Sequence, residues 1–153
     1  MAGMSQHERS KGDTDTWLTP PSVIAALGHF DLDPCGHPLS STAKHLIILP
    51  DCGLEAKWFG RVWLNPPYSN VGEWLEKLAY HGRGIALVFA RTETRWAQSI
   101  LPKATSVFFP ARRFTFLKAD GTAPSFSAGA PSMLLAFGES PNWFDIGPGW
   151  VAK

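Results

Sequence analysis

Val62-Trp63-Leu64-Asn65-Pro66-Pro67-Tyr68 is the stretch that decides the fold of this chain. Its first three residues are apolar, as expected of a short buried strand, and a helix is predicted to begin close behind it, near Asn70. A strand that leads directly into a helix places residues 65–68 at its carboxyl end, the edge at which open α/β sheets bind their ligands. The stretch therefore predicts an α/β protein with a ligand site at this turn.

The turn at residues 65–68 is rigid and rich in hydrogen-bonding groups. Its two prolines fix φ and remove two backbone N–H donors, and the residue before each proline is held extended. The amide side chain of Asn65, the carbonyl of Pro66 and the ring of Tyr68 therefore lie within four residues of one another. Such a group suits a flat molecule that carries an exocyclic amine.

The composition is that of one compact globular domain. The 153 residues are 44% hydrophobic and include seven Trp and ten Phe, whereas only 18% are charged. The first residues are polar and lack apolar periodicity, so we expect a flexible tail over 1–15 and a single domain over 16–153. The net charge of +1 argues against a global electrostatic footprint for nucleic acid, so a polyanion must be met by a local patch.

The two cysteines, Cys35 and Cys52, do not form a disulfide framework. Together with His37 they lack paired Cys-x-x-Cys spacing and a fourth ligand, so we expect no metal site. The sequence shows no signal peptide and no run of eighteen apolar residues. We therefore expect a cytoplasmic protein with reduced thiols and no membrane partner.

Strands and helices are predicted to alternate along the chain. A capping box of Asn70 and Glu73 opens a helix that ends at Gly82, and Thr92 or Thr94 caps another that ends before Pro102. About ten residues separate the first two predicted strands, so we expect an abbreviated helix or an irregular loop there. The predicted strands cover 30–33, 45–49, 62–64, 85–90, 107–109 with an extension over 113–117, and a final strand over 133–137.

Three predicted strand ends carry groups suited to a site: Asp33-Pro34-Cys35-Gly36, Asp51, and residues 65–68. In a mostly parallel sheet these ends lie on one edge. Thr19 is a good N-cap for a helix that begins with Pro20 and Pro21. The free N–H groups at the start of that helix could bind a carboxylate.

Several short motifs resemble those of the phage-encoded DNA N-6-adenine methyltransferase family, and the resemblance covers residues 17–137. The motifs are Trp17-x-Thr19-Pro20, Phe30-Asp31-Leu32-Asp33-Pro34-Cys35, Asp51-x-Gly53-Leu54 with Trp58, Trp63-x-Asn65-Pro66-Pro67-Tyr68-Ser69 and Ala90-Arg91-Thr92-Glu93-Thr94. The family implies a compact Rossmann-like methyltransferase fold, a mostly parallel sheet with an antiparallel C-terminal strand, over residues 16–153. It also implies methyl transfer from S-adenosyl-L-methionine to adenine N6 in DNA.

The resemblance implies a role for each matching residue on the cofactor side. Thr19 and Pro20 would hold the methionine carboxylate, and Asp33, in the loop that continues through Pro34, Cys35 and Gly36, would accept from the ammonium. Asp51 would bind the ribose hydroxyls, with an Asx turn before Gly53 as an equal alternative and Glu55 as the substitute ligand.

On the substrate side, Asn65 and the Pro66 carbonyl would accept from the adenine amine, Pro67 would keep the turn rigid, and Tyr68 would stack on a base flipped out of the duplex. Four arginines could together bind DNA phosphates: Arg91, Arg95, Arg112 and Arg113. For any single one of them, a solvated surface charge is the better interpretation. Phe114, Phe116 and Phe126 are expected to pack in the core or in loops.

Other functions remain open from the sequence. Asn-Pro-Pro-Tyr also resembles motifs of amino-methyltransferases that act on RNA or on protein glutamine, and the fold could serve a non-catalytic phage DNA-binding module. The first crossover is too short for a glycine-rich turn and a full helix, which departs from larger methyltransferases. Base-sequence specificity must come from loops such as 120–131, from a partner, or be low. If the chain is phage-encoded, it is expected in the host cytoplasm.

Overall fold

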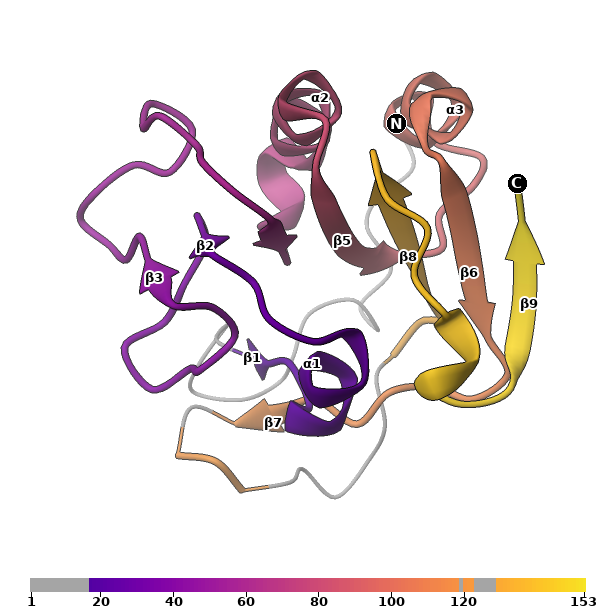
Figure 1. The fold of residues 1–153 in the computed structure, drawn as a ribbon, viewed down its shortest axis with the longest axis horizontal. Helices are drawn as coiled ribbons and strands as arrows, with labels where there is room; N and C mark the ends of the chain where they lie inside the picture. The colour runs from indigo at the N-terminus through magenta and orange to yellow at the C-terminus, as the bar shows by residue number, and fades with distance from the viewer. Residues whose placement is uncertain (1–16, 119, 123–128) are drawn as a thin grey trace.

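The computed structural model describes residues 17–118, 120–122 and 129–153 as a central sheet with helices on both faces (Figure 1). The helices are α1 (Pro21–Leu27), α2 (Val71–His81) and α3 (Arg95–Ile100), with 3-10 turns η2 (Tyr68–Asn70), η3 (Leu101–Lys103) and η4 (Trp143–Asp145). The strands are β1 (Trp17–Leu18), β2 (Leu32–Asp33), β3 (His45–Leu46), β4 (Val62–Leu64), β5 (Gly84–Phe89), β6 (Ser106–Pro110), β7 (Leu117–Lys118), β8 (Ser132–Phe137) and β9 (Gly149–Ala152). The predicted tail over 1–15 lies outside the described residues.

The main sheet has a parallel half and an antiparallel half. Its strand order is β3-β2-β4-β5-β8-β6-β9, in which β3, β2, β4 and β5 are parallel. β8 runs antiparallel between β5 and β6, and β9 pairs antiparallel with β6. The predicted antiparallel strand over 133–137 is thus confirmed, but it is not the final strand, and the sheet is less parallel than expected. The arrangement is compatible with a Rossmann-like fold.

The chain reverses its direction of travel across the sheet next to β2. From β2 it moves outward to β3 and then returns to β4 on the other side of β2. Leu32 pairs with Val62 in parallel register, so the carboxyl ends of β2 and β4 lie side by side. Such a reversal opens a crevice outside the carboxyl ends of the two strands, which is where ligands bind in sheets of this kind.

Successive side chains of each strand point to opposite faces of the sheet, so the protein has two hydrophobic cores, one on each face. Val62, Leu64, Ala86 and Val88 face α2 and α3, whose residues complete that cluster. Trp63, Ile85, Leu87, Phe108 and Leu134 face α1 and η4 on the other side. The first layer lies above the sheet and the second below it in Figure 1. The continuous apolar run of β5 is buried on both faces, as its sequence predicts.

Helix boundaries agree with the sequence better than helix caps do. α2 ends at Gly82, which is in the left-handed conformation with φ of 77° and donates its N–H to Leu78. The predicted capping box is wrong: the Asn70 side chain accepts from the Trp74 indole instead. Thr94 caps α3 by accepting from the N–H of Ala97.

The predicted cap of the first helix is also wrong. Pro20 occupies the N-cap of α1 and Thr19 lies buried before it, because Pro21 is the first helical residue. Pro at the first position of a helix loses no hydrogen bond, since that N–H has no intrahelical partner.

Two strand predictions need correction. The run 45–49 forms strand only at its first two residues. Residues 113–117 do not extend β6; the chain leaves the sheet, and Leu117 and Lys118 pair with β1 in a separate two-stranded sheet. The sequence analysis missed β9 and η4 altogether. The expected irregular loop after β2 is confirmed, because residues 34–44 contain no helix.

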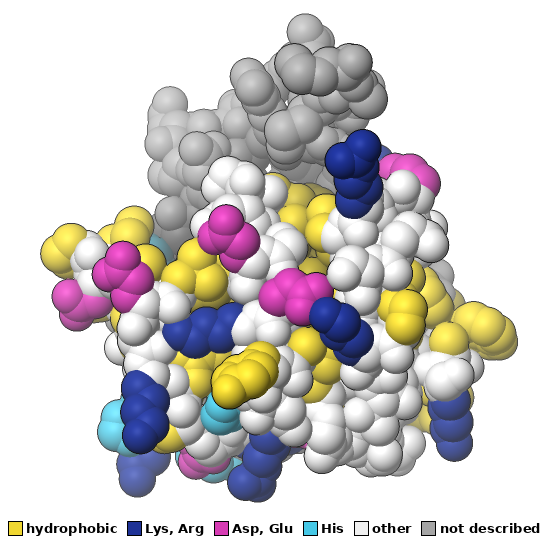
Figure 2. Space-filling model, turned by 90° about the horizontal axis from the view of Figure 1, so that it is seen from above, with side chains coloured by type: hydrophobic (Ala, Val, Ile, Leu, Met, Phe, Trp, Pro, Cys, Tyr) yellow, Lys and Arg dark blue, Asp and Glu magenta, His cyan; other side chains and the backbone are white. Residues whose placement is uncertain are grey.

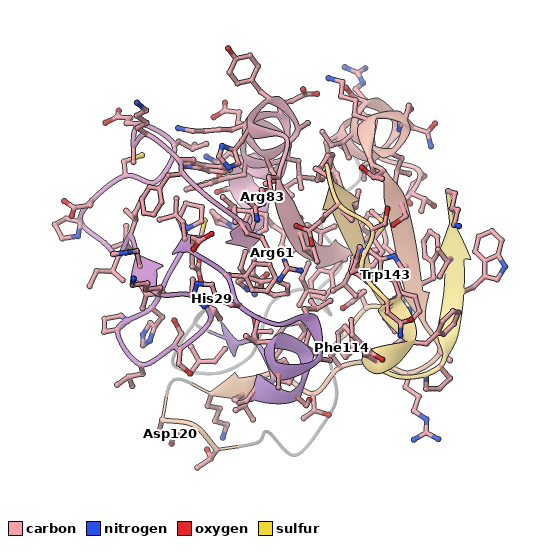
Figure 3. All side chains as sticks on the ribbon, viewed as in Figure 1. His29, Arg61, Arg83, Phe114, Asp120 and Trp143 are labelled. Atoms are coloured by element: carbon pink, nitrogen blue, oxygen red, sulfur yellow. The ribbon has the colours of Figure 1, made fainter. Side chains whose placement is uncertain are left out.

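Arg61 clamps the amino edge of the sheet, opposite the predicted site. Its guanidinium donates to Glu139 from Nε (2.9 and 3.0 Å) and Nη2 (2.6 Å), and from Nη1 to the carbonyls of Leu27 (2.8 Å) and His29 (3.0 Å). It also lies over the Phe30 ring, 4.2 Å from the centroid. One side chain therefore joins the end of α1, the start of β4 and the turn after β8 (Figure 3).

The face over α2 and α3 shows no gathering of one charge. Figure 2 shows basic, acidic and apolar side chains interspersed there. An exposed ion pair between Lys103 and Glu76, at 2.6 Å, belongs to this layer. Among the described residues, no helix is long and apolar enough to span a membrane.

Candidate active site

The structure brings the predicted site segments to the carboxyl edge of the sheet. β2 and β4 end there next to each other, followed by residues 33–36 and 65–68. α1 begins at this edge, where Ser22 and Val23 share a pocket with Pro110 at the end of β6. It ends at the opposite edge, where Leu27 accepts from Arg61. Thr19 and Pro20 therefore lie toward the same edge as the two turns.

Among the described residues, only neutral groups contact the buried carboxylate of Asp33 through hydrogen bonds. Its Oδ1 accepts from the backbone N–H of Cys35 at 3.0 Å, and its Oδ2 accepts from the Thr42 hydroxyl. Burial raises the pKa of Asp33 to about 6, because these two hydrogen bonds do not offset the loss of water around the charge. An added cation would stabilise the ionised form. Nothing in the sequence pointed to Thr42 as its partner.

The loop after Asp33 is fixed by close backbone packing. A Cβ on Gly36 would lie 2.8 Å from Leu46 Cβ, and a Cβ on Gly53 would lie 2.0 Å from the Pro34 carbonyl oxygen. Only glycine fits either position without displacing its neighbour. Cys35 packs against the core, and burial raises the pKa of its thiol. Gly53 thus brings the segment after β3 onto the loop after β2.

Side chains from the core bind the backbone of the segment that carries Asp51, whereas the carboxylates of that segment are exposed to solvent. Trp58 Nε1 donates to the Gly53 carbonyl at 2.7 Å, and Lys77 Nζ donates to the Ala56 carbonyl at 2.6 Å. Asp51 and Glu55 are both exposed. The structure therefore does not choose between these two candidates for a hydroxyl-bearing ligand.

In the Asn-Pro-Pro-Tyr turn, Asn65 is half-buried, Pro66 is buried and Pro67 is exposed. Proline at position 66 holds Asn65 extended, so Asn65 shares the sheet face of Trp63, two residues earlier. This is the face that α1 covers. The amide of Asn65 makes no hydrogen bond to the other described residues, so both of its polar atoms are available to a ligand.

Tyr68 is stacked on Phe89, the last residue of β5. The two ring centroids are 4.8 Å apart with the planes 21° from parallel, and the Tyr68 hydroxyl accepts from the Phe89 N–H. Burial raises the pKa of the Tyr68 hydroxyl. One face of the tyrosine is therefore occupied by Phe89, which was not predicted, and the stacking expected of Tyr68 would need its other face.

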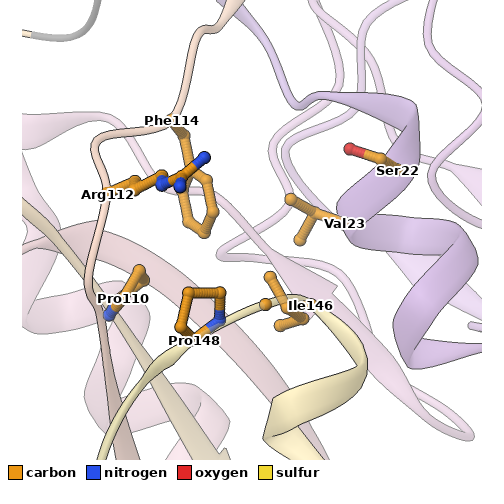
Figure 4. A pocket seen from close by; sticks show the side chains of 8 residues that line it. Ser22, Val23, Pro110, Arg112, Phe114, Ile146 and Pro148 are labelled. Atoms are coloured by element: carbon orange, nitrogen blue, oxygen red, sulfur yellow. The ribbon is translucent and has the colours of Figure 1, made fainter.

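The predicted arginines follow two strands that end at the same edge. Arg91 and Arg95 follow β5, and Arg112 and Arg113 follow β6, the last three being exposed. Arg112 and Phe114 form one wall of a pocket of about 220 Å³ between β6, α1 and the turn before β9 (Figure 4).

The expected packing role of two aromatic residues is confirmed. Phe114 and Phe116 pack against the core on the α1 side. Phe126 lies outside the described residues, as does the central half, 123–128, of the loop over 120–131 from which base-sequence specificity was expected. Within the described part of the chain, no group of three His, Cys, Asp or Glu residues is placed to hold a metal ion.

Two buried polar atoms of the described residues have no hydrogen-bond partner: Trp63 Nε1 and Ser132 Oγ. Trp63 was expected only as part of a motif, and no role was predicted for Ser132. The serine opens β8 and pairs with Phe89, so it lies at the carboxyl edge. Nothing in its sequence surroundings distinguishes it from a turn serine.

Comparison with known proteins shows the family of this chain. A family model described as DNA N-6-adenine-methyltransferase (Dam) matches residues 6–145. This chain belongs to the Dam family. It is similar to a DNA N-6-adenine-methyltransferase of Escherichia phage T1, with 28% identity over 106 residues that cover 62% of this chain and 44% of that protein. The matched region thus spans less than half of that Dam relative. No solved structure matches the chain.

Proposed function

We propose that this protein transfers a methyl group from S-adenosyl-L-methionine to the N6 amino group of adenine in DNA. The observation that carries the proposal is the adjacency of two turns at the reversal point of the sheet: one follows the buried Asp33, and the other presents Asn65. Membership of the Dam family supports the same reaction. We further propose that residues 16–153 form one methyltransferase domain with a Rossmann-like fold.

The chemistry of the Asp33 loop fits this cofactor. A buried carboxylate with only neutral partners and a raised pKa is suited to a cationic ligand, and the cofactor carries an ammonium group. Asp33 would bind that ammonium, and Pro34, Cys35 and Gly36 would shape the wall beside it. Thr19 and Pro20 would meet the carboxylate, and Asp51 the ribose. When bound, the cofactor supplies a methyl group activated by a sulfonium.

The residues of the Asn-Pro-Pro-Tyr turn would orient the amine. The lone pair of an adenine amine is delocalised into the ring, so the amine is a poor nucleophile. The Asn65 Oδ1 and the Pro66 carbonyl would each accept one N6 hydrogen, which favours a pyramidal nitrogen and exposes its lone pair. Pro67 keeps the turn rigid. Orientation of this kind lowers a barrier by about 7–11 kcal/mol without a metal or a strong base.

The sheet order would put the cofactor and the base on different sides of β4. Asp33 lies on β2, on one side of β4, whereas Phe89 and Ser132 lie on β5 and β8, on the other. The base would lie over β4 and β5, where the free face of Tyr68 stacks on it with about 1–3 kcal/mol. A base buried this deeply would be flipped out of the duplex. Arg91, Arg95, Arg112 and Arg113 would then bind phosphates around the opening.

Incubation with cofactor labelled in its methyl group, and separately with duplex DNA, RNA and protein extract, tests the substrate class. We expect label in N6-methyladenine of the DNA. Label confined to RNA or to protein glutamine would instead establish one of the alternative amino-methyltransferases.

Replacement of the catalytic amide tests the site. Asn65→Ala should abolish most turnover and leave cofactor affinity close to wild type, because the proposed Asn65 contacts belong to the amine. Asn142→Ala is the matched control, since the Asn142 amide donates to Asp145 at 2.9 Å near η4. A parallel loss of cofactor affinity in Asn65→Ala would contradict the assigned role.

A further inference from the structure

The hydroxyl of Ser132 is an anomaly within the protein. The residue is 6% exposed and its Oγ has no hydrogen-bond partner among the described residues. A buried hydroxyl without a partner is destabilising, because the water that it bonded in the unfolded chain is not replaced. An unsatisfied group of this kind calls for an explanation, and one explanation is a ligand that completes it.

Strand register places Ser132 on the base side of the proposed site. Ser132 is paired directly with Phe89, so both side chains lie on the same face of the sheet. That face is the one shared by Leu134 and Trp63, toward α1, and Asn65 extends along it. Ser132 is therefore next to the ring on which Tyr68 is stacked.

The distance between the two strands suits one base. β4 and β8 are separated by β5 alone, and the register of β4 brings Asn65 level with Leu87, two residues before the Phe89 that pairs with Ser132. At the usual strand spacing and rise, the backbones at Asn65 and Ser132 are therefore about 12 Å apart. Two side chains and a purine edge, joined by hydrogen bonds of about 3 Å, bridge such a gap. The cofactor loop lies beyond β4, at β2, so the cofactor is the less suitable partner for Ser132.

Once the adenine amine is bound by the Asn-Pro-Pro-Tyr turn, the polar atoms of adenine that remain near Ser132 are hydrogen-bond acceptors. Asn65 and Pro66 would accept both hydrogens of the N6 amine. The ring nitrogens that flank the amine, N1 and N7, are acceptors, and a serine hydroxyl can donate to either.

We propose that Ser132 is a substrate-recognition residue whose hydroxyl donates to a ring nitrogen next to the amine of the target adenine. The proposal rests on the proposed function and adds to it a base contact from outside the Asn-Pro-Pro-Tyr turn. The hydroxyl has no partner among the described residues, and binding of the base would complete it.

Oligonucleotides that carry one target adenine, 1-deazaadenine or 7-deazaadenine test the contact with wild type and Ser132→Ala. Each analogue replaces one ring nitrogen with carbon. In wild type, one of the two should lower kcat/KM by about fivefold, the value of one hydrogen bond. Ser132→Ala should lower kcat/KM for adenine by a similar factor and no longer distinguish adenine from that analogue.

Ser106→Ala is the matched control. Ser106 is also 6% exposed, but its Oγ accepts from Trp143 Nε1 at 2.9 Å, and it lies at the start of β6, on the amino edge. This variant should keep the wild-type discrimination and unfold at a lower temperature. Ser132→Ala should unfold at the wild-type temperature or above, because it removes an unsatisfied group.

The outcomes separate the two proposals. Wild type that methylates no adenine overturns the proposed function and the contact with it. Active wild type with equal discrimination in wild type and Ser132→Ala overturns only the contact. A lower unfolding temperature of Ser132→Ala, with an equal loss of kcat/KM on all three oligonucleotides, shows a structural role and also overturns it.

Discussion

Asp33→Asn should make the protein more stable at alkaline pH while it impairs cofactor binding. Asparagine has nearly the same shape, and its Oδ1 can still accept from the Cys35 N–H. Its amide can donate to the Thr42 oxygen, which reverses the hydrogen bond that Thr42 now donates. The substitution therefore removes the buried charge and keeps the two contacts that hold the loop after β2.

The magnitude follows from the pKa of the carboxyl. The folded value of about 6 lies above the ordinary 3.8, so the folded state binds the proton more tightly than the unfolded chain. The stability from protonated Asp33 is complete below the unfolded pKa and is lost as pH rises through the folded pKa. A difference of about two pKa units amounts to about 3 kcal/mol. Asp33→Asn should gain about that much at pH 8 and roughly half of it at pH 5.

Urea unfolding of wild type and variant at pH 5 and pH 8 measures this difference, because the linear extrapolation gives the free energy of unfolding at each pH. The control is Asp51→Asn, an exposed carboxylate of the same edge, which should stay within about 0.5 kcal/mol of wild type. An equal effect of Asp33→Asn at both pH values would refute a burial-raised pKa. Unchanged cofactor affinity by calorimetric titration would reject Asp33 as the ammonium ligand.

Three further substitutions test contacts that hold the fold or the site. Arg61→Lys should lower the free energy of unfolding by about 2–4 kcal/mol, since an ammonium cannot reproduce the paired bonds to Glu139; a loss below 0.5 kcal/mol, by urea unfolding, would contradict the clamp. Gly53→Ala should lower the free energy of unfolding by about 1–3 kcal/mol and weaken cofactor binding, because the Pro34 carbonyl must move to make room for the new Cβ. Wild-type cofactor affinity of this variant in a calorimetric titration would contradict the coupling between Gly53 and the cofactor loop. Tyr68→Phe should lose about 1–3 kcal/mol through the unsatisfied Phe89 N–H while KM for DNA stays unchanged, and a large rise in KM would show that the hydroxyl, not the ring, binds the base.

The sequence was sufficient to predict the helices and strands whose buried side chains recur at regular intervals along the chain. The strand over 62–64, the helix ending at Gly82 and the apolar run of β5 all lie where they were predicted. The common edge for Asp33 and Asn65 also followed, because parallel strands that alternate with helices have their carboxyl ends on one side.

The features that sequence could not supply depend on how side chains and strands pack in the folded protein. The Asn70 side chain could accept a hydrogen bond either from a backbone N–H of the helix or from the indole of Trp74. In the structure it accepts from the indole. β9 contains a glycine and an exposed Trp150, and only its pairing with β6 makes it a strand. The unsatisfied Ser132 Oγ is visible only when all of its neighbours are in place.

The position of β8 has a consequence for how the protein is made. β8 lies between β5 and β6 but follows both in the chain, so these two strands have no common partner until residues 132–137 have been synthesised. A nascent chain that has emerged only as far as Pro110 presents an open β5 edge, apolar on both faces, and such edges invite association with other chains. Co-translational folding of the sheet must therefore wait until β8 has been synthesised. The same order predicts that residues 132–153, which carry β8 and β9, would close the sheet if they were supplied in trans as a separate peptide.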